Sequence, residues 1–338
     1  MAGAAMGGAE TFYERLCLAL HGAGETVLPV IRENSDRAAR LRAGGLEPVE
    51  LGFGGPLDLL TGWRLGGTLR RFGPDVTIAW MNRGARFSRR GPWVLVGRLG
   101  GYYDLRHYRR CDHLVANTRD LVRWIVSQGW DAARVHHLPN FAPDLGGAAP
   151  VTDLPAPPGF ARLLAMGRLH RNKGFDTLLR ALPHLPRTQL WLAGEGPERG
   201  ALEALAAQLG VADRVAFLGW RGDQGALLAA CDLSICPSRH EPLGNVVLEA
   251  FSASRPVVAA ASHGPVELIA HGETGLIVPV DEPEALARAV AGLIADPARA
   301  AALAEAGRLT YERDFAEAPV VARWRALLPT LRRRDGRT

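Results

Sequence analysis

Two glutamates eight positions apart, Glu241 and Glu249, lie in the stretch PSRHEPLGNVVLEAFS (residues 237–252). Gly244 and Asn245, between them, mark the start of a helix. Asn245 and Glu249 then share one helical face, because residues four apart are neighbours on a helix. Three apolar residues share another face and are predicted to enter the core: Val247, Ala250 and Phe251.

The backbone amides at the start of that helix are free to meet a ligand. Those near Leu243, Gly244 and Asn245 favour an anion or hydroxyl oxygens. Glu241 lies in the loop just ahead of these amides, and carboxylates bind sugar hydroxyls. The two glutamates are therefore predicted to hold two parts of one elongated ligand, with its phosphates between them. The alternative is a capped helix with solvated acids.

Two cations extend this candidate site. Lys173 is the only lysine of the chain, against 39 arginines, and it precedes Gly174. Arg168 follows Gly167 at the end of a predicted strand. Lysine is a compact point charge on a flexible stem, and a diphosphate needs cations and free amides. Arg168 and Lys173 are thus candidate phosphate ligands, although one surface lysine could also survive by chance.

The second half of the chain alternates between strands and helices. Short apolar runs predict strands at 161–167, 189–193, 214–219, 233–238, 255–261 and 275–280. Helices are predicted at 174–185, 197–210, 222–232, 244–253, 264–272, 282–296 and 297–314. This alternation predicts an α/β fold with a parallel sheet covered on both faces. Ligands of such sheets bind beyond the carboxyl ends of the strands, where the glycines, cations and carboxylates gather.

The first half alternates less regularly. Helices are predicted at 9–24 and 119–130, and strands at 26–32, 75–82, 92–100 and 112–118. A stretch rich in Pro, Gly and Ala at 142–159 breaks the pattern and predicts a linker. With about two domains expected from the length, we place them at 1–145 and 160–314, with the linker at 146–159 and a last segment at 315–338.

Composition is ordinary for a soluble globular protein, with 47% hydrophobic and 22% charged residues. No apolar stretch is long enough for a transmembrane helix, and no signal peptide is visible. The four cysteines form no disulfide-like or zinc-like set. They are expected to be reduced and mostly buried in a cytoplasmic protein.

Positive charge is concentrated in the first half. Residues 1–150 hold 19 arginines and 14 acidic residues, whereas residues 151–338 are balanced. The segment 83–110 alone holds eight arginines, one acid and several aromatic residues. Such a face suits the inner, anionic surface of a membrane or an acidic acceptor. A solvated face is the alternative, and no nucleic-acid motif accompanies it, so no nucleic-acid partner is expected.

The sequence GEGPERG (residues 194–200) approaches a dinucleotide-binding fingerprint. The pattern G-x-G-x-x-G would require glycine where Arg199 stands. A Rossmann oxidoreductase is therefore disfavoured.

Together these motifs resemble those of retaining glycosyltransferases of family 4, the group 1 glycosyltransferases. GRLHRNKG (residues 167–174) resembles the family's GR-x4-KG element, and Glu241 and Glu249 form its Glu-x7-Glu motif. LAGEGP, VAFLGW, CPSRHEPLGNVVLEAFS and RPVVAAASHGPVELIAHGETGLIVP follow in the usual order. The resemblance is strong over about 160–310 and weak in the first half, through GGAE (7–10) and HLPNFAP (137–143).

This resemblance implies a GT-B fold, two Rossmann-like domains facing a cleft, in which the last segment, 315–338 with Trp324, returns to the first domain. It also implies transfer of a hexose-type sugar from a nucleotide-diphosphate sugar to a glycan or lipid-linked acceptor, with retention of configuration. The process would be synthesis of lipopolysaccharide or another cell-envelope polysaccharide. No metal ion or other cofactor is implied, and no Asp-x-Asp motif occurs.

The family's site residues map onto numbered positions of this chain. Arg168 and Lys173 would hold the donor diphosphate, Glu241 the sugar hydroxyls and Glu249 the ribose, and the first three form the implied catalytic set. The other implied donor-binding residues are Gly167, Gly194, Phe217, Leu218, Leu243, Gly244 and Asn245. The acceptor side would include Gly7, Gly8, Arg98 and Tyr102. Many members have a histidine where Arg98 stands, which is a departure from the pattern.

Two alternatives remain open at this point. One is a non-catalytic protein that keeps a nucleotide-sugar pocket, and the other is a sugar-nucleotide epimerase. A transferase needs an acceptor, an epimerase converts the donor alone, and a scaffold turns over nothing.

In the family, the chain opens with an apolar strand, then a glycine-rich loop and a helix, whereas here Met1 already stands in the loop: MAGAAMGGAETFYERL (1–16). The first strand of a doubly wound sheet is central, with neighbours on both sides. We therefore expect a gap in the first-domain sheet. We also expect a further apolar run ahead of Met1 in the natural protein, and little activity of this chain despite an intact donor pocket.

Overall fold

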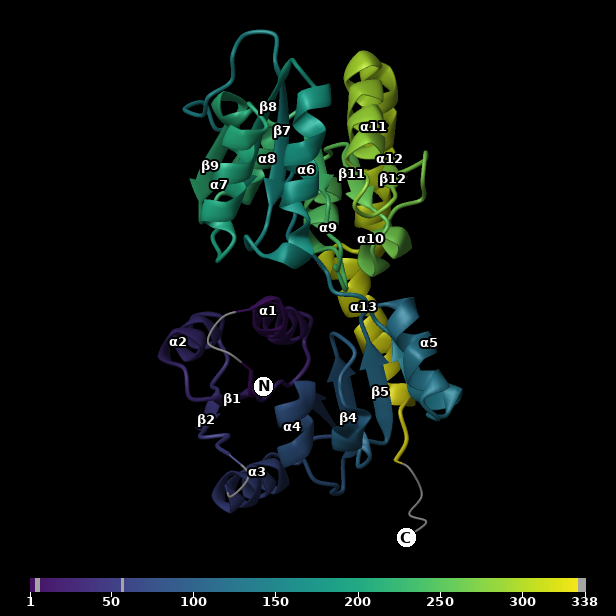
Figure 1. Ribbon diagram of the computed structural model, residues 1–338. Helices are drawn as coiled ribbons and strands as arrows, with labels where there is room; N and C mark the ends of the chain where they lie inside the picture. The colour runs from purple at the N-terminus through teal and green to yellow at the C-terminus, as the bar shows by residue number, and fades with distance from the viewer. Residues whose placement is uncertain (4–6, 56–57, 334–338) are drawn as a thin grey trace. The chain divides into compact units, whose positions relative to one another are not determined.

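The computed structural model describes residues 1–3, 7–55 and 58–333, and it divides into two compact units (Figure 1). Unit 1 comprises residues 1–141 and 317–338, and unit 2 comprises residues 142–316. These boundaries differ by two to four residues from those expected at 145 and 314. The whole predicted linker falls within unit 2.

Unit 2 contains one parallel sheet in its described residues, with the strand order β12-β11-β10-β7-β8-β9. Its strands are β7 (Ala161–Met166), β8 (Thr188–Ala193), β9 (Val215–Gly219), β10 (Leu233–Cys236), β11 (Val257–Ala260) and β12 (Leu276–Val278). Its helices are α6 (Phe175–Ala181), α7 (Arg199–Gln208), α8 (Gln224–Ala230), α9 (Asn245–Ser252), α10 (His263–Leu268), α11 (Pro283–Ala295) and α12 (Pro297–Asp314). Short 3-10 turns are η3 (Arg171–Lys173), η4 (Leu182–His184) and η5 (Ala212–Arg214).

The sheet of unit 2 is buried on both faces. Along β7, Leu163 and Ala165 belong to one apolar cluster, whereas Leu164 and Met166 belong to another. Successive side chains of a strand point to opposite faces, so the two clusters lie on opposite sides of the sheet. Helices α6 and α11 supply the first cluster, and α8 and α9 supply the second. The predicted α/β sheet covered on both faces is confirmed.

The stretch predicted as a linker is attached to unit 2. It forms neither helix nor strand, but Trp191 Nε1 donates a hydrogen bond of 2.8 Å to the carbonyl of Pro155. The amide of Val151 donates to the carbonyl of Ala226 at 3.2 Å. Its composition predicted an irregular backbone correctly, but the anchoring depends on residues far away in the sequence.

Unit 1 has two separate parallel sheets in its described residues. The smaller pairs β1 (Val30–Arg32) with β2 (Val49–Leu51), and the larger has the order β3 (Val76–Trp80), β4 (Val94–Leu99), β5 (His113–Ala116) and β6 (Val135–His137). The helices are α1 (Gly8–Gly22), α2 (Ser35–Ala43), α3 (Leu59–Phe72), α4 (Met81–Phe87), α5 (Arg119–Ser127) and α13 (Glu317–Leu327). The 3-10 turns are η1 (Leu105–Tyr108), η2 (Ala132–Arg134) and η6 (Leu328–Thr330).

Helix α13 packs in the core of unit 1, as the resemblance implied for the last segment. Trp324 is fully buried in the same apolar cluster as Phe12 and Leu16 of α1. Arg325 pairs with Glu25 at 2.8 Å. The end of the chain therefore stabilises the same unit as its beginning.

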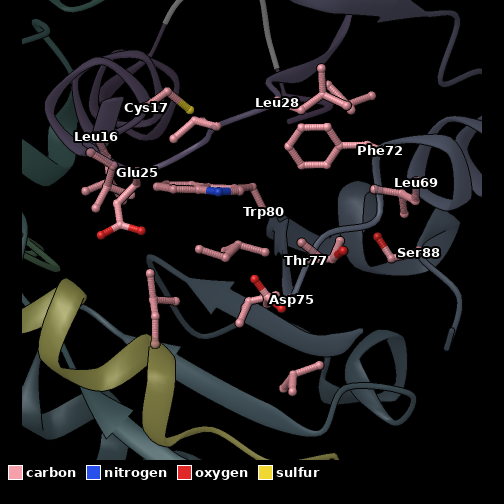
Figure 2. Close-up of a pocket in the computed structure, with 18 of the residues that line it drawn as sticks. Leu16, Cys17, Glu25, Leu28, Leu69, Phe72, Asp75, Thr77, Trp80 and Ser88 are labelled. Atoms are coloured by element: carbon pink, nitrogen blue, oxygen red, sulfur yellow. The ribbon is translucent and has the colours of Figure 1, made fainter. Parts of the chain in front are cut away.

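A cavity of about 870 Å³ lies inside unit 1 (Figure 2). Residues of both sheets line it, among them Val30 of β1 and Thr77 and Trp80 of β3. Voids larger than a water molecule are few in protein interiors. The sheet of unit 1 is thus interrupted beside a large cavity.

Among the described residues, no helix combines the length and apolar character needed to cross a membrane. All four cysteines are buried and free, as predicted from their spacing.

Candidate functional site

The loops that follow β7, β8 and β9 lie side by side at the carboxyl edge of the unit 2 sheet. The amide of Gly167 donates to the carbonyl of Ala193 at 2.9 Å, and the amide of Gly194 donates to the carbonyl of Gly219 at 2.7 Å. Gly194 has φ 153°, and a β-carbon there would lie only 1.8 Å from the Gly167 carbonyl oxygen. Glycine is required at Gly194 so that these loops can approach each other closely.

A second close approach brings the loop after β7 to the loop after β10. Gly174 has φ 63°, and a β-carbon on it would lie 2.1 Å from the carbonyl oxygen of Pro237. The amide of His240 donates to the carbonyl of Asn172 at 3.1 Å. Lys173, at the end of η3, is thereby held next to the loop that carries Glu241.

Lys173 and Glu241 form an ion pair, although 68 positions separate them in the sequence. The Glu241 side chain is only 11% exposed and that of Lys173 is 25% exposed. A buried carboxylate is costly unless it is paired and hydrogen-bonded. Glu241 has both kinds of partner, because its Oε1 also accepts the amide of Gly244 at 3.3 Å.

Helix α9 positions the second glutamate. Its predicted core residues Val247, Ala250 and Phe251 are all fully buried, so the opposite face is fixed in orientation. On that face Asn245 is exposed and Glu249 is half-buried. Gly244, with φ 86°, caps the helix start.

Arg168 follows β7 at the same edge of the sheet, and its side chain is exposed. The hydrogen bonds and ion pairs found among the described residues include none to the Arg168 side chain. This cation is therefore available to an anionic ligand without first breaking an internal pair.

Arg239 is a residue of this region that the sequence analysis did not select. It pairs with Asp176 and Asp281, each at 2.7 Å, and its hydrogen bond holds the pKa of Asp281 below the ordinary value. Two positions before Glu241, Arg239 thus ties the Glu241 loop to α6 and to the loop after β12. The only signal for this role in the sequence is an arginine adjoining the motif, which is weak in an arginine-rich chain.

The residues expected to meet the nucleobase lie on β9, an edge strand of the unit 2 sheet. Phe217 and Leu218 are half-buried. The guanidinium carbon of Arg199 lies 5.8 Å from the centre of the Phe217 ring, and Arg199 also pairs with Glu195 at 2.8 Å. A ring with a cation beside it, at the end of the sheet, is compatible with contact to a base.

The expected acceptor-side role of Arg98 is not supported by its surroundings. Arg98 is 2% exposed, and its Nη2 donates to Asn140 Oδ1 at 2.6 Å. Its guanidinium carbon lies 5.7 Å from the ring centres of both Phe12 and Trp80. Burial lowers the pKa of Arg98 to about 9. In this structure, Arg98 is a buried cation that donates hydrogen bonds through Nη1 and Nη2 and lies beside two rings, while its Nε has no partner among the described residues.

The other three acceptor-side candidates lie at the surface of unit 1. Gly7 caps α1 and Gly8 is its first residue, and both are exposed. The hydroxyl of Tyr102 donates to Asp120, and its ring meets Trp124 edge-on at 5.2 Å. These contacts place Tyr102 beside α5.

Sequence comparison identifies relatives over nearly the full chain. The family model of glycosyl transferases group 1 matches residues 161–296. The lipopolysaccharide core biosynthesis glycosyltransferase LpsE of Rhizobium meliloti is 34% identical over 333 residues, which are 95% of this chain and 96% of LpsE. LpsD of the same organism is 34% identical over 324 residues, which are 92% of either chain.

Structure comparison gives the same fold. The crystal structure of Anabaena HepE in complex with UDP has a TM-score of 0.84 at 21% identity and covers 98% of each chain. The lipopolysaccharide outer core galactosyltransferase WaaB, in its apo form, has a TM-score of 0.77 at 17% identity, again with 98% coverage of each chain. With this fold, and with relatives one-third identical along their whole length, the chain belongs to the group 1 glycosyltransferases of GT-B fold.

Proposed function

We propose that this glycosyltransferase moves a hexose-type sugar from a nucleotide-diphosphate sugar to a glycan or lipid-linked acceptor in lipopolysaccharide core or related cell-envelope synthesis. LpsE and LpsD are named for lipopolysaccharide core biosynthesis, and HepE was crystallised with UDP. The observation that carries the proposal is the cluster at the carboxyl edge of the unit 2 sheet, where the Lys173–Glu241 pair meets the amide of Gly244.

The two cations supply the charge that the reaction requires. When the bond between the anomeric carbon and the phosphate oxygen breaks, negative charge develops on the leaving nucleoside diphosphate. Exposed Arg168 and the ammonium of Lys173 are suited to bind that charge. The proposed chemistry therefore needs no metal ion, since these side chains provide the electrostatic stabilisation.

The carboxylates are assigned to the neutral parts of the donor. Glu241, fixed by Lys173 and by Gly244, would accept hydrogen bonds from hydroxyls of the sugar. Glu249, on the outward face of α9 with Asn245, would accept those of the ribose. Two carboxylates at fixed positions orient the sugar and the nucleoside at once, which lowers the entropy cost of reaction.

We further propose retention of anomeric configuration. The acceptor hydroxyl would attack the anomeric carbon from the face that the phosphate leaves, and its proton would pass to a phosphate oxygen of the departing nucleotide. One carbon–oxygen bond breaks and one forms. The proton ends on the leaving group, so the step needs no side chain of the protein as a base.

Unit 1 has a surface suited to an anionic membrane. Seven of the eight arginines in the segment 83–110 are exposed: Arg83, Arg86, Arg89, Arg90, Arg106, Arg109 and Arg110. On α3, Leu59, Leu60 and Trp63 are 77%, 54% and 75% exposed. A β-carbon on Gly62 would lie 3.8 Å from Nη2 of Arg89, so this arginine lies next to α3. We propose that this surface holds the enzyme at the inner, cytoplasmic face of the membrane, near a lipid-linked acceptor.

The catalytic proposal is tested by binding and then by product analysis. Thermal-shift measurements with UDP-, GDP- and ADP-sugars identify the donor, and nuclear magnetic resonance of the product reports the anomeric configuration, with and without a chelator. Conversion of the donor alone would indicate an epimerase, and binding without turnover on any glycan or glycolipid acceptor would indicate a scaffold. An inverted product would refute the retaining step.

The membrane proposal is tested by co-sedimentation with vesicles of phosphatidylcholine, with and without phosphatidylglycerol. We expect binding only to the anionic vesicles, weakening with salt, and further loss in Trp63→Ala. Trp220→Ala is the matched control, because Trp220 is 72% exposed but belongs to unit 2. Binding that ignores lipid charge and salt, or equal losses in both variants, would contradict the assignment of this surface.

A further inference from the structure

The loops after β7 and β10 are paired residue by residue at the carboxyl edge of the unit 2 sheet. Nη1 of Arg239 donates to the carbonyl of Arg171 at 2.8 Å. The amide of the next residue, His240, donates to the carbonyl of Asn172 at 3.1 Å. The residue that follows in each loop belongs to the proposed donor site, and these two residues form the ion pair. Two contacts therefore hold the loops together immediately before that pair.

The guanidinium of Arg239 joins this pair of loops to two further segments. Nη1 and Nη2 donate to the two carboxylate oxygens of Asp176 on α6, each at 2.7 Å, and Nη2 also donates to the hydroxyl of Thr177 at 3.2 Å. Nε pairs with Oδ1 of Asp281, in the loop after β12, at 2.7 Å. With the bond to Arg171, these contacts are as numerous as the N–H groups of a guanidinium. The Arg239 side chain thus has no donor left for a substrate.

The backbone at Asp281 is held in the left-handed conformation, with φ 59°. Residues other than glycine rarely adopt this conformation, although aspartate and asparagine tolerate it better than most. The Asp281 carboxylate also accepts the hydroxyl of Thr177 at 2.9 Å. Such a backbone persists where its surroundings fix it, and here the contacts with Arg239 and Thr177 do so.

We propose that Arg239 is a positioning residue for sugar transfer, which holds the loops after β7 and β10 at the separation that pairs Lys173 with Glu241. This role rests on the proposed donor site, because Arg239 would act on the reaction only through those two side chains.

A shift of either loop would move a charge relative to the bond that breaks. Lys173 is assigned to the leaving diphosphate and Glu241 to the sugar, so their separation sets where the cation lies. A misplacement of about 1 Å can lower a rate about 100-fold. Arginine suits the task because its planar fork serves several acceptors at fixed angles, whereas lysine is a flexible point charge.

Three substitutions test this role. Arg239→Ala removes the junction, and Arg239→Lys keeps the charge without the fork. Arg162→Ala is the matched control: Arg162 also forms a forked pair in unit 2, with Asp232 at 2.7 and 3.0 Å, but it lies at the amino end of β7. The thermal midpoint and amide hydrogen exchange are measured without ligand. Turnover is measured with the nucleotide sugar that stabilises the wild-type chain most, in millimolar guanidinium chloride and in equal sodium chloride.

We expect Arg239→Ala to lower kcat about 10- to 100-fold, with a smaller change in KM, and free guanidinium to restore part of the loss. Arg239→Lys should remain impaired. Exchange at the amides of Gly174 and His240 should become about tenfold faster in Arg239→Ala, because local opening there loses its anchor. Arg162→Ala should lower the thermal midpoint comparably, while kcat and these two amides stay as in the wild type.

Equal kcat in Arg239→Ala and Arg162→Ala would overturn the positioning role. A loss of kcat without faster exchange at Gly174 and His240, or without any rescue by guanidinium, would also overturn it. If Arg239→Ala does not fold, Arg239→Lys decides, and wild-type kcat and exchange in that variant would refute the need for the fork. Full turnover in Lys173→Ala would instead refute the donor site itself, and the role of Arg239 with it.

Discussion

Both units of this chain are built from parallel strands that alternate with helices, but they differ in how the strands are joined. In unit 2, β7 lies centrally, between β10 and β8, and all six strands belong to one continuous sheet. In unit 1, β1 and β2 are separated from β3–β6 by a cavity of about 870 Å³.

The difference matters for function because a site at a sheet edge depends on adjacent strands. The loops after β7, β8, β9 and β10 hold one another through backbone contacts, and these contacts bring Lys173 to Glu241. In unit 1 the acceptor-side candidates are dispersed: Arg98 is in the core and Tyr102 lies against α5. A continuous sheet therefore accompanies the well-defined site.

The largest expected effect is a loss of stability of unit 1 at low pH, caused by its buried amino group at Met1. Burial lowers the pKa of the Met1 amino group from 8.0 to about 5. Between these values the unfolded chain binds a proton that the folded chain does not, so stability is highest above pH 8 and is lost as the pH falls toward 5. The expected loss is about 1.4 kcal/mol per pH unit, or roughly 4 kcal/mol in all.

Urea unfolding of unit 1 from pH 5 to pH 8 measures this slope, and acetylation of the Met1 nitrogen is the control. The acetylated chain has no amine to titrate, so its stability should vary less with pH. Burial also lowers the pKa values of His113 and His136. Both histidines therefore lower the stability when the pH falls below their ordinary pKa, and they do so equally in the two forms. Identical slopes in the two forms would exclude the terminus as the cause.

A second expected effect concerns the cations of unit 2. Lys173→Ala and Arg168→Ala should each lower kcat about 100- to 1000-fold, since one electrostatic donor in a comparable site contributes about 2.7–4 kcal/mol. The thermal midpoint of unit 2 should change little in Arg168→Ala, whose side chain is exposed. Arg180→Ala removes an exposed cation of α6 in the same unit and should leave kcat unchanged. Full turnover in Arg168→Ala and Lys173→Ala would remove the diphosphate site from the proposal.

A smaller effect is expected from Glu249→Gln. Loss of the charged acceptor for ribose hydroxyls should weaken donor binding by about 1.5–3 kcal/mol, or roughly 10- to 150-fold, with kcat less affected. Isothermal titration with the nucleoside diphosphate alone measures this, because that ligand lacks the sugar. Glu273→Gln, on an exposed turn of unit 2, is the control. Equal affinities in all three proteins would place the ribose elsewhere.

The smallest effect compares the two units directly through matched glycines. Gly73 after α3 in unit 1 and Gly210 after α7 in unit 2 both have φ 67°, and neither would bring a β-carbon within 4 Å of other atoms. Alanine at either position should therefore cost only the left-handed conformation, about 1 kcal/mol. Calorimetry should show Gly73→Ala lowering the transition of unit 1 and Gly210→Ala that of unit 2. A single transition lowered equally by both would mean that the units unfold together.

Local pattern was sufficient for most elements of unit 2. Apolar runs marked β7, β8 and β10, and Gly244 with Asn245 marked the start of α9, whose core face was predicted correctly. In unit 1 the same reasoning found α1 and α5 but did not find α2, α3 or α4. The surface of α3 is mixed, as its exposed Leu59, Leu60 and Trp63 show, so the apolar period that identifies a helix is obscured there.

The sequence by itself determined which residue types stand at the strand ends, and from these it predicted Arg168, Lys173, Glu241 and Glu249 as one site. Spacing and side-chain chemistry are local properties, and the short α/β repeats leave few ways to arrange them. Only the tertiary structure decided that Lys173 pairs with Glu241, that Arg239 anchors their loop, and that Arg98 is buried beside two rings. Each of these depends on contacts between segments tens of residues apart. Burial of a charge is costly unless such a partner is present, and the partner is supplied by the fold, so these contacts have no local signature in the sequence.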